Sequence, residues 1–569
     1  MIRTFETHQI RKSKELSSSL WNFRTLKEGC KDKTIQVMVP SCWETYPDTL
    51  TYRGKAVYSK EFEARGNIRL EFKGVSHTAE VYVDGEKVAS HYNAYTGFEA
   101  IVKDAKPGMH TLEVIADNSF GQESALHVDN DYQSYGGITR GVVLEELKDV
   151  YIQWIHFTPY CKNGVWMGKA DVSIRNISHS CFSGEIKLAL NDKQPEENQN
   201  RAELLGSAEI YLEAGKTEVV SFEDIRCDGV NAWSPENPFL YYITGTIADE
   251  NGEAIDDLID RMGFREVKIS GKDILLNGEK LLVKGFCRHE DHPQFGCAIP
   301  FAAIQSDLML IKDLGANSIR TVHYPNDELM LDLCDEQGIL VWEENHARGM
   351  EEEAMRNPNF KRQCEDCIRE MITAHFNHPS IYIWGILNEC ASETDYGKEC
   401  YTAQYDLIKE LDPSRPRSSA SCKFKTDICL GLPEVVSYNI YPKWYHDTPV
   451  AEYLDDLYQW VQTETEGAGK PFLVTEIGAG AIYGYRHPSK VKWSEEYQAD
   501  ALAEQIEAVL AQEGCSGIYI WQFCDGRVCN GWFEKRPRTM NNKGVVDEYR
   551  RPKLSYEVVK RAFSGQRMQ

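Results

Sequence analysis

Two glutamates each close an apolar, strand-like run in the second half of the 569-residue chain. Glu389 ends "IYIWGILNE" and Glu476 ends "PFLVTE". Two opposed carboxyl groups are what the hydrolysis of a glycoside requires, because one protonates the leaving oxygen while the other attacks the anomeric carbon. Either glutamate alone would be an ordinary carboxylate at a strand end. Their joint placement favours a catalytic pair.

Other polar and aromatic side chains stand where neighbouring apolar runs end, or in the loop "RTMNNKG" (538–544) that follows the last run. They are Asn388, His323, Tyr441, Tyr445, Trp521, Arg538, Asn541 and Lys543. Each has a plain structural alternative: Trp521 could pack in a core, and "NNKG" could be a solvated turn. Their value as a site depends on a fold that brings them together.

Eight strand-like runs alternate with amphipathic stretches from about residue 270 to the C-terminus. The runs are "LLVKGF", "ANSIRTV", "GILVWEE", "IYIWGIL", "RPRSSAS", "VVSYNIY", "PFLVTEI" and "GIYIWQF". Residues 301–315 and 495–514 are two of the stretches that we expect to be helices. The alternation predicts a (β/α)₈ barrel over residues 269–569. Sites in such barrels form where the carboxyl ends of the strands meet, which would gather the residues named above.

The first half of the chain is rich in β-strand patterns instead. The runs 56–64, 67–75, 78–92 and 108–117 alternate apolar and polar residues, and Asp84-Gly85 and Pro107-Gly108 suggest hairpin turns between them. We predict a jelly-roll β-sandwich over residues 1–149. Short strands continue over residues 150–268 and predict an immunoglobulin-like β-sandwich.

Composition excludes several classes of protein. The net charge of −25 argues against nucleic acid or an anionic membrane surface as a partner. No apolar run is long enough to span a membrane, and the N-terminus has no apolar signal region. We therefore expect a cytoplasmic protein whose 17 cysteines are reduced thiols.

A metal site is not expected. The pair Cys364 and Cys367 has no second pair at zinc spacing, and His289 and His292 lack an evident third ligand. Glycoside hydrolysis by two carboxyl groups also needs no organic cofactor.

Several longer segments resemble glycoside hydrolase family 2, and within it the β-glucuronidases of gut bacteria. "NHPSIYIWGILNE" (377–389) is similar to the acid/base signature, and "VTEIGAG" (474–480) to the nucleophile segment. Residues 317–344 resemble the signature around Arg-x-x-His-Tyr-Pro, with Val322 where a small polar residue is more usual. "NDYQSYGGITRGV" (130–142) is similar to a loop of the first sandwich. The resemblance covers nearly the whole chain.

The resemblance implies roles for the residues at the reacting centre. Glu389 would be the general acid/base with a raised pKa, and Glu476 the charged nucleophile of a retaining mechanism. Asn388 would bond the sugar 2-hydroxyl, and Tyr441 would orient the nucleophile.

The resemblance also implies contacts to the rest of the sugar. His323 and Trp521 would form walls of the sugar site, and Asp131 would reach in from the first sandwich to a hydroxyl. A turn aspartate is the simple alternative for Asp131.

The loop after the last strand would then recognise an acidic sugar. Asn541 and Lys543 match the Asn-x-Lys pair of β-glucuronidases, and an amide and an ammonium are suitable donors for a sugar carboxylate. Arg536 and Arg538 add positive charge, and Tyr445 resembles a tyrosine that contacts the same carboxylate. An unpaired buried ammonium would be costly in an enzyme for neutral sugars. We therefore expect the substrate to be a small-molecule or oligosaccharide β-D-glucuronide.

Three alternatives stay open. A β-galacturonidase would differ at a single hydroxyl, and a β-galactosidase would not need the ammonium of Lys543. A non-catalytic carbohydrate-binding protein would not need both glutamates. The segment 346–360 is short and suggests an open site mouth. We expect a homo-oligomer in which a neighbour could help to cover that mouth.

Overall fold

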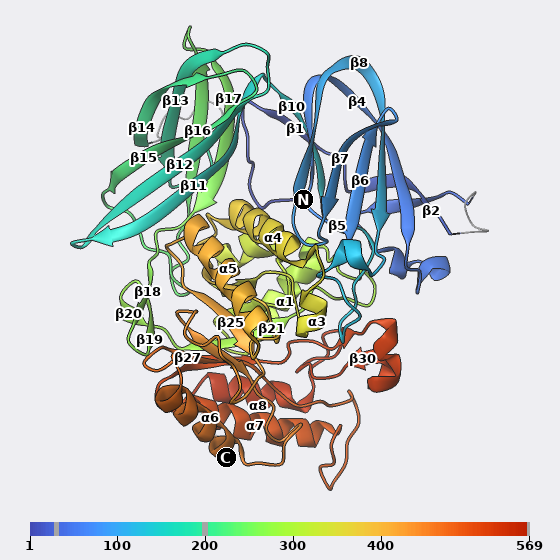
Figure 1. Ribbon diagram of the computed structural model, residues 1–569, viewed down its shortest axis with the longest axis vertical. Helices are drawn as coiled ribbons and strands as arrows, with labels where there is room; N and C mark the ends of the chain where they lie inside the picture. The colour runs from blue at the N-terminus through green and yellow to red at the C-terminus, as the bar shows by residue number, and fades with distance from the viewer. Residues whose placement is uncertain (28–32, 196–202, 566–569) are drawn as a thin grey trace.

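The computed structural model describes residues 1–27, 33–195 and 203–565 (Figure 1). Two β-rich regions lie side by side at one end of the molecule, and a region of mixed helices and strands forms the other end. Both β-rich regions precede the mixed region in the sequence. The architecture is therefore two β-sandwich domains followed by an α/β barrel, as predicted.

The first sandwich is built around one large antiparallel sheet with the strand order β1-β10-β4-β8-β6-β7, and β2 and β3 extend it beside β4. Its strands are β1 (Lys12–Glu15), β2 (Ser19–Thr25), β3 (Ile35–Val39), β4 (Lys55–Phe72), β6 (Thr78–Val83), β7 (Glu86–Tyr92), β8 (Phe98–Asp117) and β10 (Val142–Leu147). Two short strands, β5 (Val75–Ser76) and β9 (Gly137–Ile138), pair separately. Buried and partly exposed residues alternate along β6, as expected for a strand with one face on a core.

Two strand ends that the sequence predicted in this sheet were wrong. Asp84-Gly85 does form the turn between β6 and β7. Pro107-Gly108 does not form a hairpin turn, because it lies inside the 20-residue strand β8. The runs 56–64 and 67–75 likewise merge into the 18-residue strand β4. Pairing of β4 with β8 continues through register shifts near Gly66, so long-range pairing overrides the local preference for a turn.

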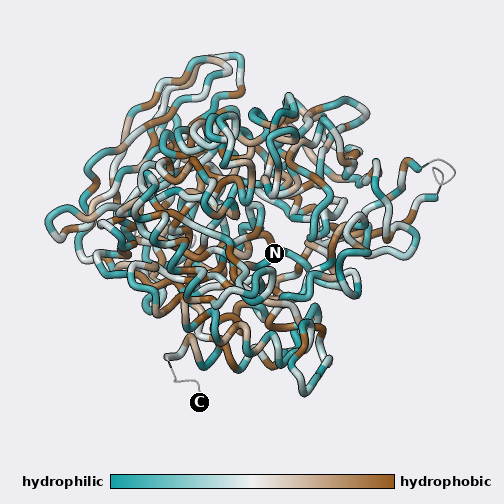
Figure 2. Tube along the Cα trace, turned by 60° about the horizontal axis from the view of Figure 1, so that its bottom comes forward, coloured by the Kyte–Doolittle hydropathy of each residue, from teal (hydrophilic) through white to brown (hydrophobic). Residues whose placement is uncertain are grey.

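The second sandwich packs a sheet of three strands on a sheet of four, which is consistent with the predicted immunoglobulin-like arrangement. The first sheet contains β11 (Val150–Lys162), β12 (Val165–Asn176) and β15 (Thr217–Cys227). The second contains β13 (Phe182–Asn191), β14 (Glu203–Leu212), β16 (Tyr241–Asp249) and β17 (Ala254–Met262). Figure 2 shows hydrophobic and hydrophilic residues interspersed along the chain trace, and Ile152, Val172 and Ile243 are buried in the core of this sandwich.

All eight predicted barrel strands are present and close into a parallel barrel. A small sheet precedes them, formed by β18 (Val267–Ser270), β19 (Asp273–Leu276) and β20 (Glu279–Lys280). The barrel strands are β21 (Val283–Arg288), β22 (Ser318–Thr321), β23 (Leu340–Glu344), β24 (Ile381–Ile386), β25 (Arg417–Ser421), β26 (Val436–Asn439), β27 (Phe472–Ile477) and β28 (Cys515–Ile520). Every residue of β24 and β27 is buried, which explains their continuous apolar runs.

Helices connect most of these strands. They are α1 (Phe301–Asp313), α2 (Glu328–Gln337), α3 (Glu352–Met355), α4 (Phe360–His375), α5 (Asp395–Leu411), α6 (Val450–Glu464), α7 (Glu495–Ala511) and α8 (Leu554–Phe563). The stretches 301–315 and 495–514 are confirmed as helical. No helix within residues 1–27, 33–195 and 203–565 has the length and apolar content needed to cross a membrane.

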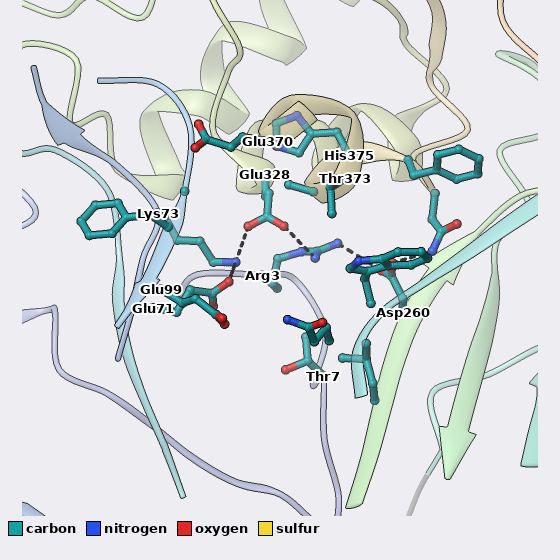
Figure 3. A pocket seen from close by; sticks show the side chains of 18 of the residues that line it. Arg3, Thr7, Glu71, Lys73, Glu99, Asp260, Glu328, Glu370, Thr373 and His375 are labelled. Atoms are coloured by element: carbon teal, nitrogen blue, oxygen red, sulfur yellow. Dashed lines mark hydrogen bonds and ion pairs between the residues drawn. The ribbon is translucent and has the colours of Figure 1, made fainter. Parts of the chain in front are cut away.

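A cavity of about 430 Å³ lies where the two sandwiches, the N-terminal segment and the barrel meet (Figure 3). Glu328, at the start of α2, forms an ion pair with Lys73 of the first sandwich at 2.6 Å and another with Arg3 at 3.2 Å. Arg3 also lies 3.6 Å from Asp260 of β17. These ion pairs tie the three domains together, so the charges that line this cavity are largely matched by one another.

Asp332, Asp335 and His378 have the spacing of a cation site and are buried. However, the guanidinium of Arg3 donates twice to Asp332 at 2.9 Å, and His378 bonds Asp335 at 2.6 Å. The negative charge is thus already compensated, and the cluster joins the N-terminal segment to the barrel.

Three buried histidines fill the seam between the first sandwich and the barrel. The rings of His77 and His127 stack at 3.7 Å, and His346 meets His127 edge-on at 4.3 Å. Within the part of the chain that the structure describes, neither ring nitrogen of His346 has a hydrogen-bond partner. Burial lowers the pKa of all three histidines, to about 3 for His346. The folded protein therefore keeps all three rings neutral at physiological pH.

We expect acid to destabilise this seam. Unfolded histidines bind protons below a pH of about 6.5, whereas the buried ones do not, so the free energy of unfolding falls as pH falls. Each histidine can contribute up to about 1.4 kcal/mol per pH unit. The apparent Tm measured from pH 7 to pH 5 should fall less steeply in His346→Phe, which loses no hydrogen bond. Equal slopes would contradict this assignment.

Candidate active site

Glu389 stands at the carboxyl end of β24, where the chain leaves the barrel. Its φ is 54°, an uncommon value for a residue other than glycine, and its backbone N–H donates to Ala420 O at 2.8 Å. The Nδ2 of Asn439 donates to one carboxyl oxygen at 3.0 Å, and Arg348 Nη2 lies 3.5 Å from the other. The side chain retains 17% exposure, as a group that must reach a leaving oxygen requires.

Glu476 lies on β27 and is almost fully buried. Arg320 Nη1 donates to its Oε1 at 2.9 Å, and the phenol of Tyr441 donates to its Oε2 at 2.6 Å. Each carboxyl oxygen is therefore held by a separate donor. This arrangement fixes the orientation of the carboxyl group, which a nucleophile requires.

Asn388 links the two carboxyl groups. Its Oδ1 accepts from Arg320 Nη2 at 2.7 Å and from Asn439 Nδ2 at 3.0 Å. Arg320 also donates to Glu476 through Nη1, and the same Nδ2 of Asn439 donates to Glu389. The Nδ2 of Asn388 has no partner within the described part of the chain, so it can donate to a sugar hydroxyl.

The two carboxyl groups interact electrostatically. Burial, and after it the charge of Glu389, raise the pKa of Glu476 to about 8, while Arg320, Tyr441 and Arg348 act in the opposite direction. The resemblance implied a charged nucleophile, and the raised pKa of Glu476 differs from that expectation. A pKa of about 8 keeps Glu476 protonated at neutral pH in this structure.

The sequence did not identify Glu344 as a site residue, although it ends the strand-like run "VWEE". It is buried and bonds Arg320 through two nitrogens at 3.0 Å, His323 Nδ1 at 2.9 Å and Trp342 Nε1 at 2.8 Å. It therefore orients Arg320, which holds Glu476, and His323, which lines the site.

Glu344→Gln should lower kcat about 10- to 100-fold, because an amide cannot accept both guanidinium bonds and Arg320 would shift. The matched control is Glu343→Gln. Glu343 precedes Glu344 on β23, points to the opposite face, and bonds His375 and Asn326. Steady-state kinetics with a circular-dichroism check of folding would test this. Equal losses in both variants would mean that Glu344 only supports the fold.

Lys543 is 4% exposed and ends in an aromatic cage. Its ammonium lies 5.2 to 5.6 Å from the ring centres of Tyr441, Trp444 and Tyr445, and donates to the Tyr445 hydroxyl at 3.0 Å. Among the residues that the structure describes, no carboxylate bonds this ammonium. Burial tends to raise the pKa of Tyr445, but the charge of Lys543 lowers it overall.

Asp131 enters the site from the first sandwich and is surrounded by donors. Arg536 Nη2 lies 2.9 Å and Asn541 Nδ2 3.2 Å from its Oδ2, while Arg348 Nη2 lies 3.3 Å from Oδ1. Despite burial, the charges of Arg348 and Arg536 hold the pKa of Asp131 well below its usual range. The sequence did not single out Arg348, which lies in the loop after β23 and also contacts Glu389.

Arg538 is not brought to this cluster. Its guanidinium pairs with Glu548, and its side chain is partly exposed. Arg536, two residues earlier, takes the place beside Asp131. Arg538 has a positive φ of 61°, so the backbone turns between these two arginines and sends their side chains to different partners.

His323 and Trp521 form a stacked pair beside the carboxyl group of Glu476. Their rings lie 5.2 Å apart with an angle of 14° between the planes. His323 Nε2 has no hydrogen-bond partner among the described residues and lies 3.9 Å from Glu476 Oε1. Trp521 also belongs to the buried core, so the structure supports its packing role and leaves a contact to sugar as a prediction.

A barrel mouth that brings two carboxyl groups together among several hydrogen-bond donors is typical of a glycosidase. Family comparisons agree with this class. The model for the family 2 sugar binding domain matches residues 22–148, that for glycosyl hydrolases family 2 matches residues 150–265, and that for its TIM barrel domain matches residues 267–567. The chain belongs to glycosyl hydrolase family 2.

Individual relatives differ in their named substrates. A crystal structure of a GH2 beta-galacturonidase from Eisenbergiella tayi bound to galacturonate is 68% identical, with both chains fully covered and a TM-score of 0.96. A beta-glucuronidase of Paenibacillus borealis is 27% identical over 95% of this chain and 92% of its own. A beta-galactosidase of Thermoanaerobacterium thermosulfurigenes is 28% identical over 92% of this chain and 69% of its own.

Proposed function

We propose that the protein is a retaining β-galacturonidase. The observation that supports a uronic acid as the substrate is the ammonium of Lys543. This ammonium is buried among aromatic rings without a carboxylate partner in the described structure. A substrate carboxylate would supply the missing charge. A neutral galactoside offers no such group.

The choice of galacturonide over glucuronide is supported by sequence identity. The sequence alone favoured a β-glucuronide, and galacturonide was its open alternative. The E. tayi beta-galacturonidase is 68% identical over the full length, whereas the P. borealis beta-glucuronidase is 27% identical. The two substrates differ only at C4, so the donors around Asp131 are our candidates for reading that hydroxyl.

The proposed reaction proceeds in two steps. Glu389 gives its proton to the glycosidic oxygen as the C1–O bond breaks, and an oxygen of Glu476 forms a new bond to C1. Glu389 then takes a proton from water, whose oxygen attacks C1 and releases Glu476. Arg320 and Tyr441 hold Glu476 in place throughout, and Asn388 can strengthen its bond to the 2-hydroxyl at each transition state.

Three expectations from the sequence remain proposals. These are the domain limits at residues 149 and 268, the homo-oligomer, and the cytoplasmic location. Mass photometry of the purified protein would test the oligomer.

The deciding experiment compares kcat/KM on the p-nitrophenyl β-D-galacturonide, β-D-glucuronide and β-D-galactoside. We expect the galacturonide to be cleaved fastest and the galactoside to be slower by about 10⁴-fold, since a site built for a charged group rejects an analogue that lacks it. A glucuronide preference would keep the uronic-acid proposal and overturn the C4 assignment. Comparable rates on the galacturonide and galactoside would overturn both.

A further inference from the structure

A buried ion pair lies behind the loop that presents Lys543. The ammonium of Lys553, which immediately precedes α8, lies 2.7 Å from Asp525 Oδ1, beyond the end of β28. Both side chains have 0% exposure. Neither group takes part in the proposed reaction.

The ion pair holds both residues that flank Lys543. The Oδ1 of Asp525 accepts the backbone N–H of Gly544 at 2.9 Å. The ammonium of Lys553 donates to Asn542 O at 3.3 Å and to Ala481 O at 2.7 Å. The backbone N–H of Ala481 in turn donates to Asn542 O at 2.9 Å. The loop is thus anchored to the segment that follows the nucleophile strand β27.

A second set of buried contacts completes the anchor. Gln498 of α7 donates to Gly544 O at 3.0 Å, and Ser555 of α8 donates to Gln498 Oε1 at 2.8 Å. A Cβ on Gly544 would lie 2.3 Å from the backbone nitrogen of Asp525. This close approach requires glycine and leaves the loop backbone little room to move.

We propose that Lys553 and Asp525 are positioning residues that set the discrimination between a uronic acid and a neutral sugar. This inference rests on the proposed function of Lys543. Removing two charges from water is costly, and a buried pair can often be replaced by apolar groups with little loss of stability. The contacts of this pair to the loop indicate that its role is to fix the backbone from which Lys543 reaches its cage.

The geometry explains why such an anchor would act on specificity. The Lys543 ammonium must meet a substrate carboxylate while staying within reach of Tyr445 and the surrounding rings. A displacement of about 1 Å far from the reacting atoms can cost about 100-fold in rate. The carboxyl groups Glu389 and Glu476 are held by other residues, so a shift of this loop would weaken binding of uronic acids first.

The test uses Lys553→Met in the full-length protein. We expect the ratio of kcat/KM on the galacturonide to that on the galactoside to fall about 10- to 100-fold, mainly through KM for the galacturonide. Inhibition by free galacturonate should weaken in parallel, with inhibition by galactose unchanged. Lys560→Met is the matched control, because Lys560 lies on α8, is exposed and pairs with Asp313; it should leave the ratio unchanged.

An unchanged ratio in Lys553→Met, or equal losses on both substrates, would overturn the inference. If this variant does not fold, Asp525→Asn serves instead, since the amide oxygen can still accept from Gly544 while the charge is lost. It should lower the same ratio, and an unchanged ratio would again overturn the inference. A wild type that cleaves both substrates equally would overturn the proposed function as well, which separates the two failures.

Discussion

Lys543→Met should lower kcat/KM on the aryl β-D-galacturonide by about 10²- to 10³-fold and leave the residual rate on the galactoside almost unchanged. Removing one partner of a buried charge pair typically costs about 2–5 kcal/mol, and each 1.36 kcal/mol is a factor of ten in rate. Methionine keeps the length and the apolar stem, so Tyr441, Trp444 and Tyr445 can still pack against it. The expected loss therefore measures the contribution of the ammonium to kcat/KM.

Steady-state kinetics on both substrates would measure this effect, and the same loop offers a control. Lys535 is exposed, and its ammonium lies over Trp532 at 4.5 Å. Lys535→Met should change neither rate by more than a small factor. If Lys543→Met lowered both rates equally, the lysine would support the local structure and the uronic-acid assignment would fail.

The meeting of the two glutamates at one barrel mouth could be predicted because its signal is local. Glu389 and Glu476 each follow a run of buried residues, and parallel barrel strands bring their carboxyl ends to a common face. The same reasoning found Tyr441 and Asn388, which the structure places in contact with the network around these glutamates. The end of a strand determines where the side chain begins, and closure of the barrel brings the strand ends together.

Loop residues were harder to assign for a physical reason. Arg536 and Arg538 are two positions apart, and only the backbone turn between them decides which one meets Asp131. Arg348 contacts both Asp131 and Glu389, yet it lies in a short loop with no periodic pattern. Side chains in such loops are directed by tertiary contacts that a single sequence does not display.

The ionisation of the pair also depends on tertiary structure. The family resemblance implied a proton on Glu389, but the burial of Glu476 in the barrel and the nearby Glu389 charge raise the pKa of Glu476. Glu476 lies in a strand whose residues are all buried, and Asp131 and Tyr132 of the first sandwich are buried as well. Strand patterns alone predict neither effect.

Glu389→Gln should affect the formation of the glycosyl-enzyme and its hydrolysis separately. On a p-nitrophenyl galacturonide the loss of general acid catalysis should lower the rate of glycosylation by about 10²- to 10⁴-fold. A dinitrophenyl galacturonide has a leaving group that needs little protonation, so its glycosylation should suffer much less. Burst kinetics with the dinitrophenyl substrate would show the glycosyl-enzyme accumulating, because its hydrolysis still requires a base.

The pH profile of the same variant tests the coupling between the two carboxyl groups. Glu476 must be ionised to attack, so kcat/KM rises as pH increases through its pKa. The charge of Glu389 is the second cause that raises this pKa, after burial. Replacing that charge with a neutral amide lowers the pKa of Glu476, and the acidic limb for the dinitrophenyl substrate should move to lower pH. The near-isosteric change keeps an oxygen that can accept from Asn439. An acidic limb that stays in place would mean that the charge of Glu389 does not act on Glu476, whereas a shift to higher pH would assign the limb to a different group.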